Sequence, residues 1–269
     1  MSESLKQRVI TGIIIGIPMI FMVLFSDLTR IIFLSLILIL CAYEFLSLHY
    51  KAVDKKYVFI VPSLLVSGVF LVASLYRFDF ASIFLFVGVA FNCVLILDLF
   101  FGKKSFLSSI PWSKGILYTT IPLSALIFTS ASPVFHLLVL GTLFLIWVSD
   151  IGAYAVGKSI GKNKLMPSVS PGKSWEGFLG AGVICILSSY IFYKYLGHLT
   201  LQQWAIMAAI VWIFGSIGDL VESKMKRYIG VKDSGTILPG HGGFLDRFDG
   251  FYFCIPFVLL YINHINKIY

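Results

Sequence analysis

The chain has 269 residues, of which 58% are hydrophobic and 13% are charged, and it carries a net charge of +8. Soluble domains contain about 25% charged residues, so this composition excludes a soluble globular protein and indicates an integral membrane protein. In a membrane protein an excess of basic residues first indicates which loops lie in the cytoplasm, and we expect no nucleic-acid partner.

Apolar runs separated by polar breaks predict nine membrane-spanning helices, because a spanning helix needs roughly 20 mostly apolar residues. In chain order they cover residues 9–25, 31–48, 57–76, 80–101, 116–133, 135–157, 176–196, 203–222 and 249–264. The predicted fold class is therefore all-α, a polytopic integral membrane protein. We divide it into N-terminal helices, 1–133, as a lipid-facing scaffold with candidate dimer contacts, and a catalytic region, 134–269, with loops 158–175 and 224–248.

Lysine and arginine are distributed unevenly over the two sides of this arrangement. Of the 21 residues of these two types, only Arg30, Arg77, Lys194 and Lys267 fall on one side, and the other 17 share the side of the N-terminus. The positive-inside rule then places the N-terminus in the cytoplasm and the C-terminus outside. The two long loops would face the cytoplasm, where nucleotides are available.

The stretch Gly152–Ser159, GAYAVGKS, fits the nucleotide-binding pattern G-x-x-x-x-G-K-[ST]. A true loop of this kind follows a buried strand and opens a helix. Here the match overlaps the end of the predicted helix 135–157, so we interpret it as coincidental. Asp150, just before it, is more informative, because an ionisable residue inside a membrane span is by default a functional hypothesis.

Three other predicted spans carry a carboxylate within them or near an end, at Glu44, Asp98 and Asp219. Insertion scales give a cost of about 2.5–3.5 kcal/mol for an Asp near the centre of a membrane-spanning helix, so each of these carboxylates needs a structural or functional explanation. No motif surrounds Glu44 or Asp98, and for both a structural hydrogen bond stays open beside a functional role.

Asp219 begins a pattern that places four polar side chains on one helical face. Glu222, Ser223 and Lys226 follow it at i+3, i+4 and i+7, and Arg227 flanks them. A face with an acid in the membrane and cations one to two turns later can hold a metal at one end and phosphates at the other. An ordinary solvated helix end with Glu–Lys pairs is the alternative.

The segment after this face is rich in glycine, which lets the backbone approach a ligand closely. It ends in His241, Gly242, Gly243, Asp246, Arg247 and Asp249. If the chain is helical from residue 244, Asp246 and Asp249 share a face and form an oxygen-rich cluster with Asp219. Hard oxygen ligands without paired His or Cys favour Mg²⁺ over zinc.

The other long loop contains Ser170–Gly177, SPGKSWEG, at the entrance of the predicted helix 176–196. The N–H groups at a helix N-terminus favour phosphate, and Ser170 and Lys173 are candidate contacts to a nucleotide or lipid phosphate. Ser174 is a candidate N-cap, and Glu176 suits the helix dipole. A purely structural role for this loop is the alternative.

The stretch from Ser223 to Asp249 resembles the signature of phosphatidate cytidylyltransferases, also called CDP-diacylglycerol synthases. SPGKSWEG, with Asp150 ahead of it, is similar to the same family, whereas the first half is similar in topology only. The resemblance implies an enzyme that transfers CMP from CTP to phosphatidate, with Mg²⁺ and, as a second candidate cofactor, K⁺. It also implies a homodimer in a bacterial inner membrane or an organelle membrane, of which we expect the bacterial inner membrane.

We assign the candidate residues to roles within this reaction. The metal ligands would be Asp219, Asp246 and Asp249; the catalytic groups Lys226, Arg227, His241 and Asp249; the substrate contacts Ser170, Lys173, Ser223, Gly242, Gly243 and Arg247; and the supporting residues Asp150 and Glu176. His241 contacts a phosphate, donates to the leaving pyrophosphate or braces its loop, and Arg247 alternatively pairs with a neighbouring Asp.

Two other functions are compatible with the sequence. One is a CTP-dependent lipid kinase, or a cytidylyltransferase for another lipid phosphate, because acyl-chain contacts are generic apolar residues. The other is a transporter, since transporters also contain intramembrane acids and glycine-interrupted helices. The absence of paired repeat halves in the sequence argues against the transporter.

Overall fold

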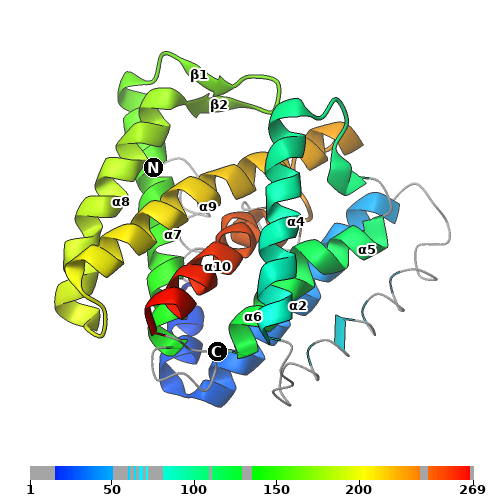
Figure 1. The fold of residues 1–269 in the computed structure, drawn as a ribbon. Coiled ribbons are helices and arrows are strands. Elements are labelled where there is room, and N and C mark those ends of the chain that lie inside the picture. Colours follow the sequence, from blue (N-terminus) through cyan, green and yellow to red (C-terminus); the bar gives the residue numbers. More distant parts are fainter. Residues whose placement is uncertain are drawn as a thin grey trace.

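The computed structural model describes residues 16–50, 81–108, 111–128, 135–236 and 242–266, with the isolated positions 60, 64, 67, 68 and 71. A short helix, Gly16–Phe25, comes first. The elements that follow are α2 (Asp27–Tyr50), α4 (Ala81–Phe101), η1 (Phe106–Ser108), α5 (Pro111–Gly115), η2 (Ile116–Thr120), α6 (Ile121–Phe128), α7 (Phe135–Ile160), β1 (Lys164–Met166), β2 (Ser170–Ser174), α8 (Trp175–Leu196), α9 (Leu201–Ile229) and α10 (Leu245–Asn266). Figure 1 shows a bundle of helices with one small hairpin at its edge.

The predicted all-α membrane fold is confirmed for the described part of the chain, apart from this hairpin. Six helices are long and apolar enough to cross a membrane, namely α2, α4, α7, α8, α9 and α10. The predicted span 57–76 lies mostly outside the described residues, and the span 116–133 begins in the π-helical turn η2. The count of nine spans and the orientation of the termini stay predictions.

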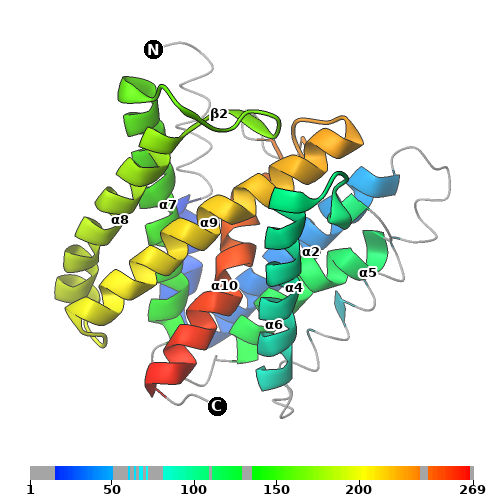
Figure 2. The same ribbon diagram turned by 45° about the horizontal axis from the view of Figure 1, so that its top comes forward.

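The C-terminal helices form the most closely packed part of the molecule. α7 packs on α8, α8 packs on α9, and α9 packs on α10. α10 also contacts α2, α4 and α6, so it joins the two halves of the chain. Figures 1 and 2 show α9 running obliquely across the bundle, with α10 beside it.

Both predicted loops of the catalytic region are shorter than the sequence indicated. α9 continues to Ile229, past the predicted end at 222, and stops where Gly230 takes the left-handed conformation with φ 82°. The N–H of Gly230 is bonded to the carbonyls of Lys226 and Arg227, as expected of a glycine C-cap. The predicted loop 224–248 therefore begins with helix, as the spacing of Asp219, Ser223 and Lys226 on one helical face also indicated.

The predicted loop 158–175 is largely a β-hairpin, which corrects the all-α expectation at this point. α7 runs to Ile160, so the stretch from Gly152 to Gly157 is helical, as predicted, and Lys158 and Ser159, which were expected in the loop, are helical too. β1 and β2 then pair in antiparallel fashion, with Lys164 opposite Ser174. Ser174 ends the hairpin and caps α8, accepting a hydrogen bond of 3.2 Å from Gly177 N, which confirms the predicted N-cap.

α9 and α10 approach closely at Gly218, next to the candidate site. A Cβ atom added there would lie 2.5 Å from Phe253 Cβ and 2.9 Å from Asp249 O. Gly215, one turn earlier on α9, is more open, since the nearest heavy atoms to an added Cβ are 4.0 Å away. The close contact at Gly218 thus sets the spacing of the two helices that carry most of the candidate residues.

We expect Gly218→Ala to lower the free energy of unfolding by about 1–3 kcal/mol, because the added methyl overpacks the contact. Gly215→Ala is the matched control, in which alanine fits and the better helix propensity stabilises by about 0.5–1 kcal/mol. Unfolding of the purified protein in mild detergent measures both changes. Equal midpoints for Gly218→Ala and Gly215→Ala would show that the spacing of α9 and α10 is not set at Gly218.

Candidate active site

A cavity between α7, α9 and α10 brings together three of the predicted acids. Its walls contain Ile146, Ser149 and Asp150 from α7, Val211, Gly215, Ser216 and Asp219 from α9, and Asp249 and Gly250 from α10. Three carboxylates from three different helices therefore surround one space. Ser149 and Ser216 add hydroxyl oxygens to the same walls, so the cavity is lined by hard oxygen donors.

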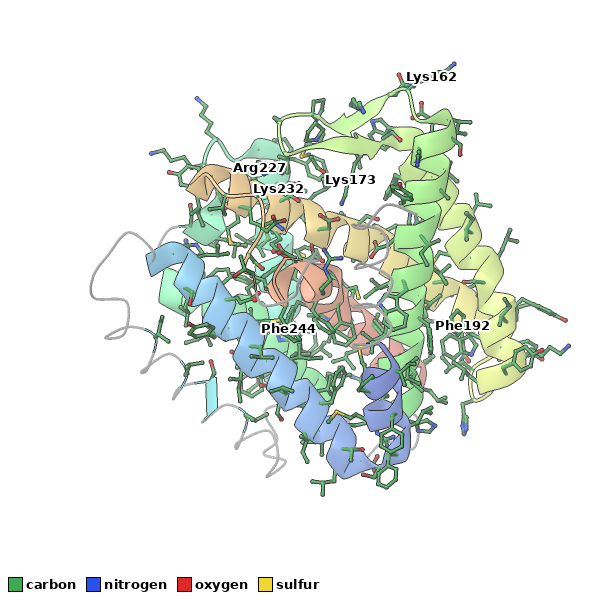
Figure 3. All side chains as sticks on the ribbon, turned by 180° about the vertical axis from the view of Figure 1, so that it is seen from behind. Lys162, Lys173, Phe192, Arg227, Lys232 and Phe244 are labelled. Atoms are coloured by element: carbon green, nitrogen blue, oxygen red, sulfur yellow. The ribbon has the colours of Figure 1, made fainter. Side chains whose placement is uncertain are left out.

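The carboxylate of Asp219 has two partners, one of which comes from the hairpin. Lys173 Nζ, on β2, lies 2.6 Å from Asp219 Oδ2. The hydroxyl of Ser223, one turn later on α9, donates to Asp219 Oδ1 over 3.1 Å. Figure 3 shows Lys173 between the hairpin and α9. The predicted loop 158–175 thus brings a cation to an acid of α9.

Lys226 is buried and is paired with the protein's own acids. Its Nζ lies 2.6 Å from Asp246 Oδ1 on α10 and 3.2 Å from Glu222 Oε1 on α9. Asp246 also accepts hydrogen bonds from Ser234 N, at 2.8 Å from Oδ2, and from Gly243 N, also at 2.8 Å. In this arrangement Lys226 joins α9 to α10 and fixes Asp246, whereas the sequence assigned it to a substrate phosphate.

The two candidate arginines are more accessible than Lys226. Arg227 is exposed, its Nε donates to Val169 O at 3.4 Å, and its guanidinium also reaches Val231 O at 3.2 Å. Figure 3 shows Arg227 at the end of α9 that lies nearest the hairpin. Arg247 is exposed on the first turn of α10, between the two Asp residues of that helix.

The remaining candidates lie around this site at different depths. Ser170 begins β2, and Gly242 has a positive φ of 83° just before Gly243. Glu176 is placed outside the cavity, where it accepts hydrogen bonds from Lys162 N (3.1 Å) and from Asn163 Nδ2 (2.7 Å). It therefore braces the base of the hairpin. His241 lies outside the described residues.

The structure also gives partners to acids whose role the sequence left open. Asp98 on α4 accepts from Phe106 N at 3.1 Å and lies 3.3 Å from Lys224 Nζ on α9. Glu44 on α2 accepts from Ser234 Oγ and Leu245 N. Glu222 is fully buried beside Lys226. Of these three acids, only Glu222 could be placed beside Lys226 from the sequence, because it shares the helical face of Asp219 and Lys226.

The oxygen donors around the cavity suit a magnesium ion that also binds substrate. Among the described residues, no group of three His, Cys, Asp or Glu side chains lies close enough to hold a metal without other ligands. Mg²⁺ is usually held by one or two carboxylates together with substrate phosphates, so it does not require three. Asp219 and Asp249 line the same cavity and fit that pattern.

Comparison with known proteins places the chain among cytidylyltransferases. Residues 6–265 match the sequence pattern of the cytidylyltransferase family. The phosphatidate cytidylyltransferase of Bacillus subtilis (strain 168) is 34% identical over 270 residues, covering 95% of this chain and 96% of that protein. The phosphatidate cytidylyltransferase of Staphylococcus haemolyticus (strain JCSC1435) is 49% identical over 120 residues, which cover 44% of this chain and 46% of that protein. In that second match the chain spans about half of the relative's length.

We expect Lys226→Met to lower the free energy of unfolding by roughly 3–5 kcal/mol, because it leaves Glu222 and Asp246 buried without their cation. Arg227→Met, at the exposed neighbouring position, is the matched control and should change stability by no more than about 0.5 kcal/mol. Chemical denaturation of the two purified variants in the same detergent compares them. A Lys226→Met protein as stable as Arg227→Met would contradict a structural role for this ammonium group.

Proposed function

We propose, since the chain belongs to the cytidylyltransferase family, that it transfers CMP from CTP to phosphatidate, forming CDP-diacylglycerol and releasing pyrophosphate. The observation that carries this proposal is the meeting of Lys173 with Asp219 at a cavity that Asp150 and Asp249 also line. A cation-bearing hairpin opposite clustered acids suits a reaction between two polyanions. The phosphatidate cytidylyltransferase named in Bacillus subtilis, which aligns over nearly its whole length, supports the choice of lipid.

The reaction needs charge neutralisation more than it needs a general base. A phosphate monoester carries about −1.5 to −2 charges near neutral pH, so a phosphatidate oxygen is already an anion. It would attack the α-phosphorus of CTP, the new P–O bond would form, and the bond to the β-phosphate would break with pyrophosphate as the leaving group. Positioning and electrostatic stabilisation supply most of the rate enhancement in phosphoryl transfer of this kind.

The cations at the hairpin side would bind the phosphates. Lys173 is half-buried and contacts Asp219, which lines the cavity, so it would bind a phosphate there when a metal ion replaces it on Asp219. Arg227, exposed at the end of α9, would bind the outer phosphates, and Arg247 is a further candidate on α10. Ser170 and the backbone around Gly242 and Gly243 would complete the contacts to substrate.

A bound Mg²⁺ ion would supply the positive charge that the phosphates need. Asp219 and Asp249 would hold it, with Asp246, one turn before Asp249 on α10, as the third candidate ligand. Asp150 faces the same cavity and would support these ligands. K⁺ is a second candidate cofactor of the same oxygen-rich region.

The uneven distribution of lysine and arginine supports a site that faces the cytoplasm. CTP would then enter from the aqueous side, and the lipid would enter laterally from the bilayer. Polar groups at membrane depth are tolerated where they line such a cavity. The bacterial inner membrane as the location, and a homodimer as the assembly, stay predictions.

We expect purified protein given phosphatidate and CTP labelled at the α-phosphate to form a labelled lipid, and no labelled lipid when the γ-phosphate carries the label. Thin-layer chromatography of the extracted lipids measures both. Free polyprenol in place of phosphatidate is the control and should stay unlabelled. Transfer of the γ-label to any lipid would instead indicate a CTP-dependent kinase.

We expect Asp219→Asn and Asp249→Asn each to lower kcat/KM by about 100-fold or more, because each removes a carboxylate that would hold the Mg²⁺ ion needed to neutralise the reacting phosphates. Asp246→Asn should also lose activity, since it alters both a candidate ligand and the partner of Lys226. Asp98→Asn, at an acid remote from the cavity, is the control and should keep most activity. Pyrophosphate release, measured over a range of Mg²⁺ concentrations, compares them. An unchanged Mg²⁺ dependence in Asp219→Asn or Asp249→Asn would remove that residue from the metal site.

A further inference from the structure

Glu44 is a buried carboxylate in the first half of the chain that contacts the catalytic region directly. It lies on α2 and is 2% exposed. Its Oε2 accepts a hydrogen bond of 3.0 Å from Ser234 Oγ and one of 2.8 Å from Leu245 N. About 190 residues of chain separate Glu44 from Ser234. The carboxylate thus connects α2 to the two ends of the glycine-rich segment between α9 and α10.

The contact with Leu245 caps α10 from a distant helix. Leu245 is the first residue of α10, and the N–H groups of a helix's first turn have no partner within the helix. A carboxylate there satisfies one such group and is favoured by the helix dipole. Because Asp246 is the next residue, the position of this first turn also determines where Asp246 points.

The contact with Ser234 reaches Asp246 by a second route. The hydroxyl of Ser234 donates to Glu44, and the N–H of the same residue donates to Asp246 Oδ2 over 2.8 Å. Ser234 is therefore held between the two carboxylates, and Asp246 in turn holds Lys226. Glu44 fixes Asp246 through Ser234 and through Leu245, without touching the cavity itself.

Two glycines of this segment, Gly235 and Gly243, are packed against the Glu44 carboxylate. A Cβ atom at Gly235 would lie 2.6 Å from Glu44 Oε1, and one at Gly243 would overlap both Glu44 Oε2 and Ser234 Oγ. Glu44 Oε1 is itself buried and has no hydrogen-bond partner among the described residues. Burying a carboxylate costs several kcal/mol. If Glu44 contributed only packing, an apolar residue at this position would make the protein more stable.

We propose that Glu44 is a positioning residue of the active site, which holds the glycine-rich segment and the first turn of α10 so that Asp246 and Lys226 keep their places. The proposal rests on the proposed function for its kinetic consequences, but the contact itself can be tested without activity. Glu44 acts through Ser234 and Leu245, so its removal should alter turnover more than CTP binding.

The test compares Glu44→Ala, Glu44→Gln and Tyr252→Phe in the full chain in detergent. Tyr252→Phe is the matched control, because its hydroxyl donates to Ile37 O at 3.2 Å and so joins the same two helices, α10 and α2, away from the segment. Hydrogen exchange of the Ser234 and Leu245 amides reports the contact. Pyrophosphate release with CTP and phosphatidate gives kcat and KM.

For Glu44→Ala we expect the amide exchange rates of Ser234 and Leu245 to rise by about tenfold or more, and kcat to fall by a similar factor. Loss of hydrogen bonds to a charged group produces changes of this size. The KM for CTP should change less than kcat. Glu44→Gln keeps an acceptor oxygen and should lie between Glu44→Ala and the unaltered protein. Tyr252→Phe should leave both exchange at these amides and kcat unchanged.

The proposal is wrong if Glu44→Ala exchanges and turns over like the unaltered protein, or if Tyr252→Phe lowers kcat as much as Glu44→Ala. It is also wrong if Glu44→Gln loses as much activity as Glu44→Ala while the segment stays protected, since the charge would then act directly. If Glu44→Ala does not fold, the comparison of Glu44→Gln with Tyr252→Phe tests the proposal. An unaltered protein without CTP turnover would overturn the proposed function, and the exchange measurement would still decide whether Glu44 holds the segment.

Discussion

The candidate site depends on a buried ammonium group, that of Lys226, between two carboxylates on different helices. Its contact with Asp246 joins α9 to α10, and its contact with Glu222 lies within α9. Removing charges from water is costly, and close pairing offsets that cost only when the partners stay in place. The close approach of α9 and α10 at Gly218 keeps them there, so backbone packing and charge pairing support each other.

The site contains more acidic than basic side chains. Around it the structure places Asp150, Asp219, Glu222, Asp246 and Asp249, against Lys173 and Lys226 as their close cations. A surplus of negative charge repels a nucleotide unless another cation offsets it. This supports the proposed Mg²⁺ ion on electrostatic grounds that are independent of ligand geometry. The ion pair between Lys173 and Asp219 is consistent with this ion, because a metal bound to Asp219 would release Lys173 to bind a phosphate.

The sequence predicted those parts of the molecule that depend on local pattern. The helices followed from apolar runs, and the helical state of residues 152–157 followed from their place in one. The grouping of Asp219 with Ser223 followed from helical periodicity. The pairing of Lys226 with Glu222 is within reach of the same periodicity, whereas its partner on α10 could not be predicted, because Asp246 is brought to it by a glycine-rich segment with no regular period. The hairpin was missed because β1 has only three residues.

The first half of the chain, which the sequence indicated only as a scaffold, places individual polar groups against the catalytic helices. Besides Glu44, the amide of Asn92 on α4 donates to Phe253 O on α10 over 2.8 Å. The missing N–H of Pro256 leaves the carbonyl of Tyr252 without its helical donor, and Asn92 binds the next carbonyl along the same turn. Within a bilayer, water is not available to polar side chains such as that of Asn92, so neighbouring helices supply their partners. The apolar runs of the first half therefore carry a few polar residues whose partners lie 161 to 201 residues away in the chain, and these contacts help to hold α10, which carries Asp246 and Asp249.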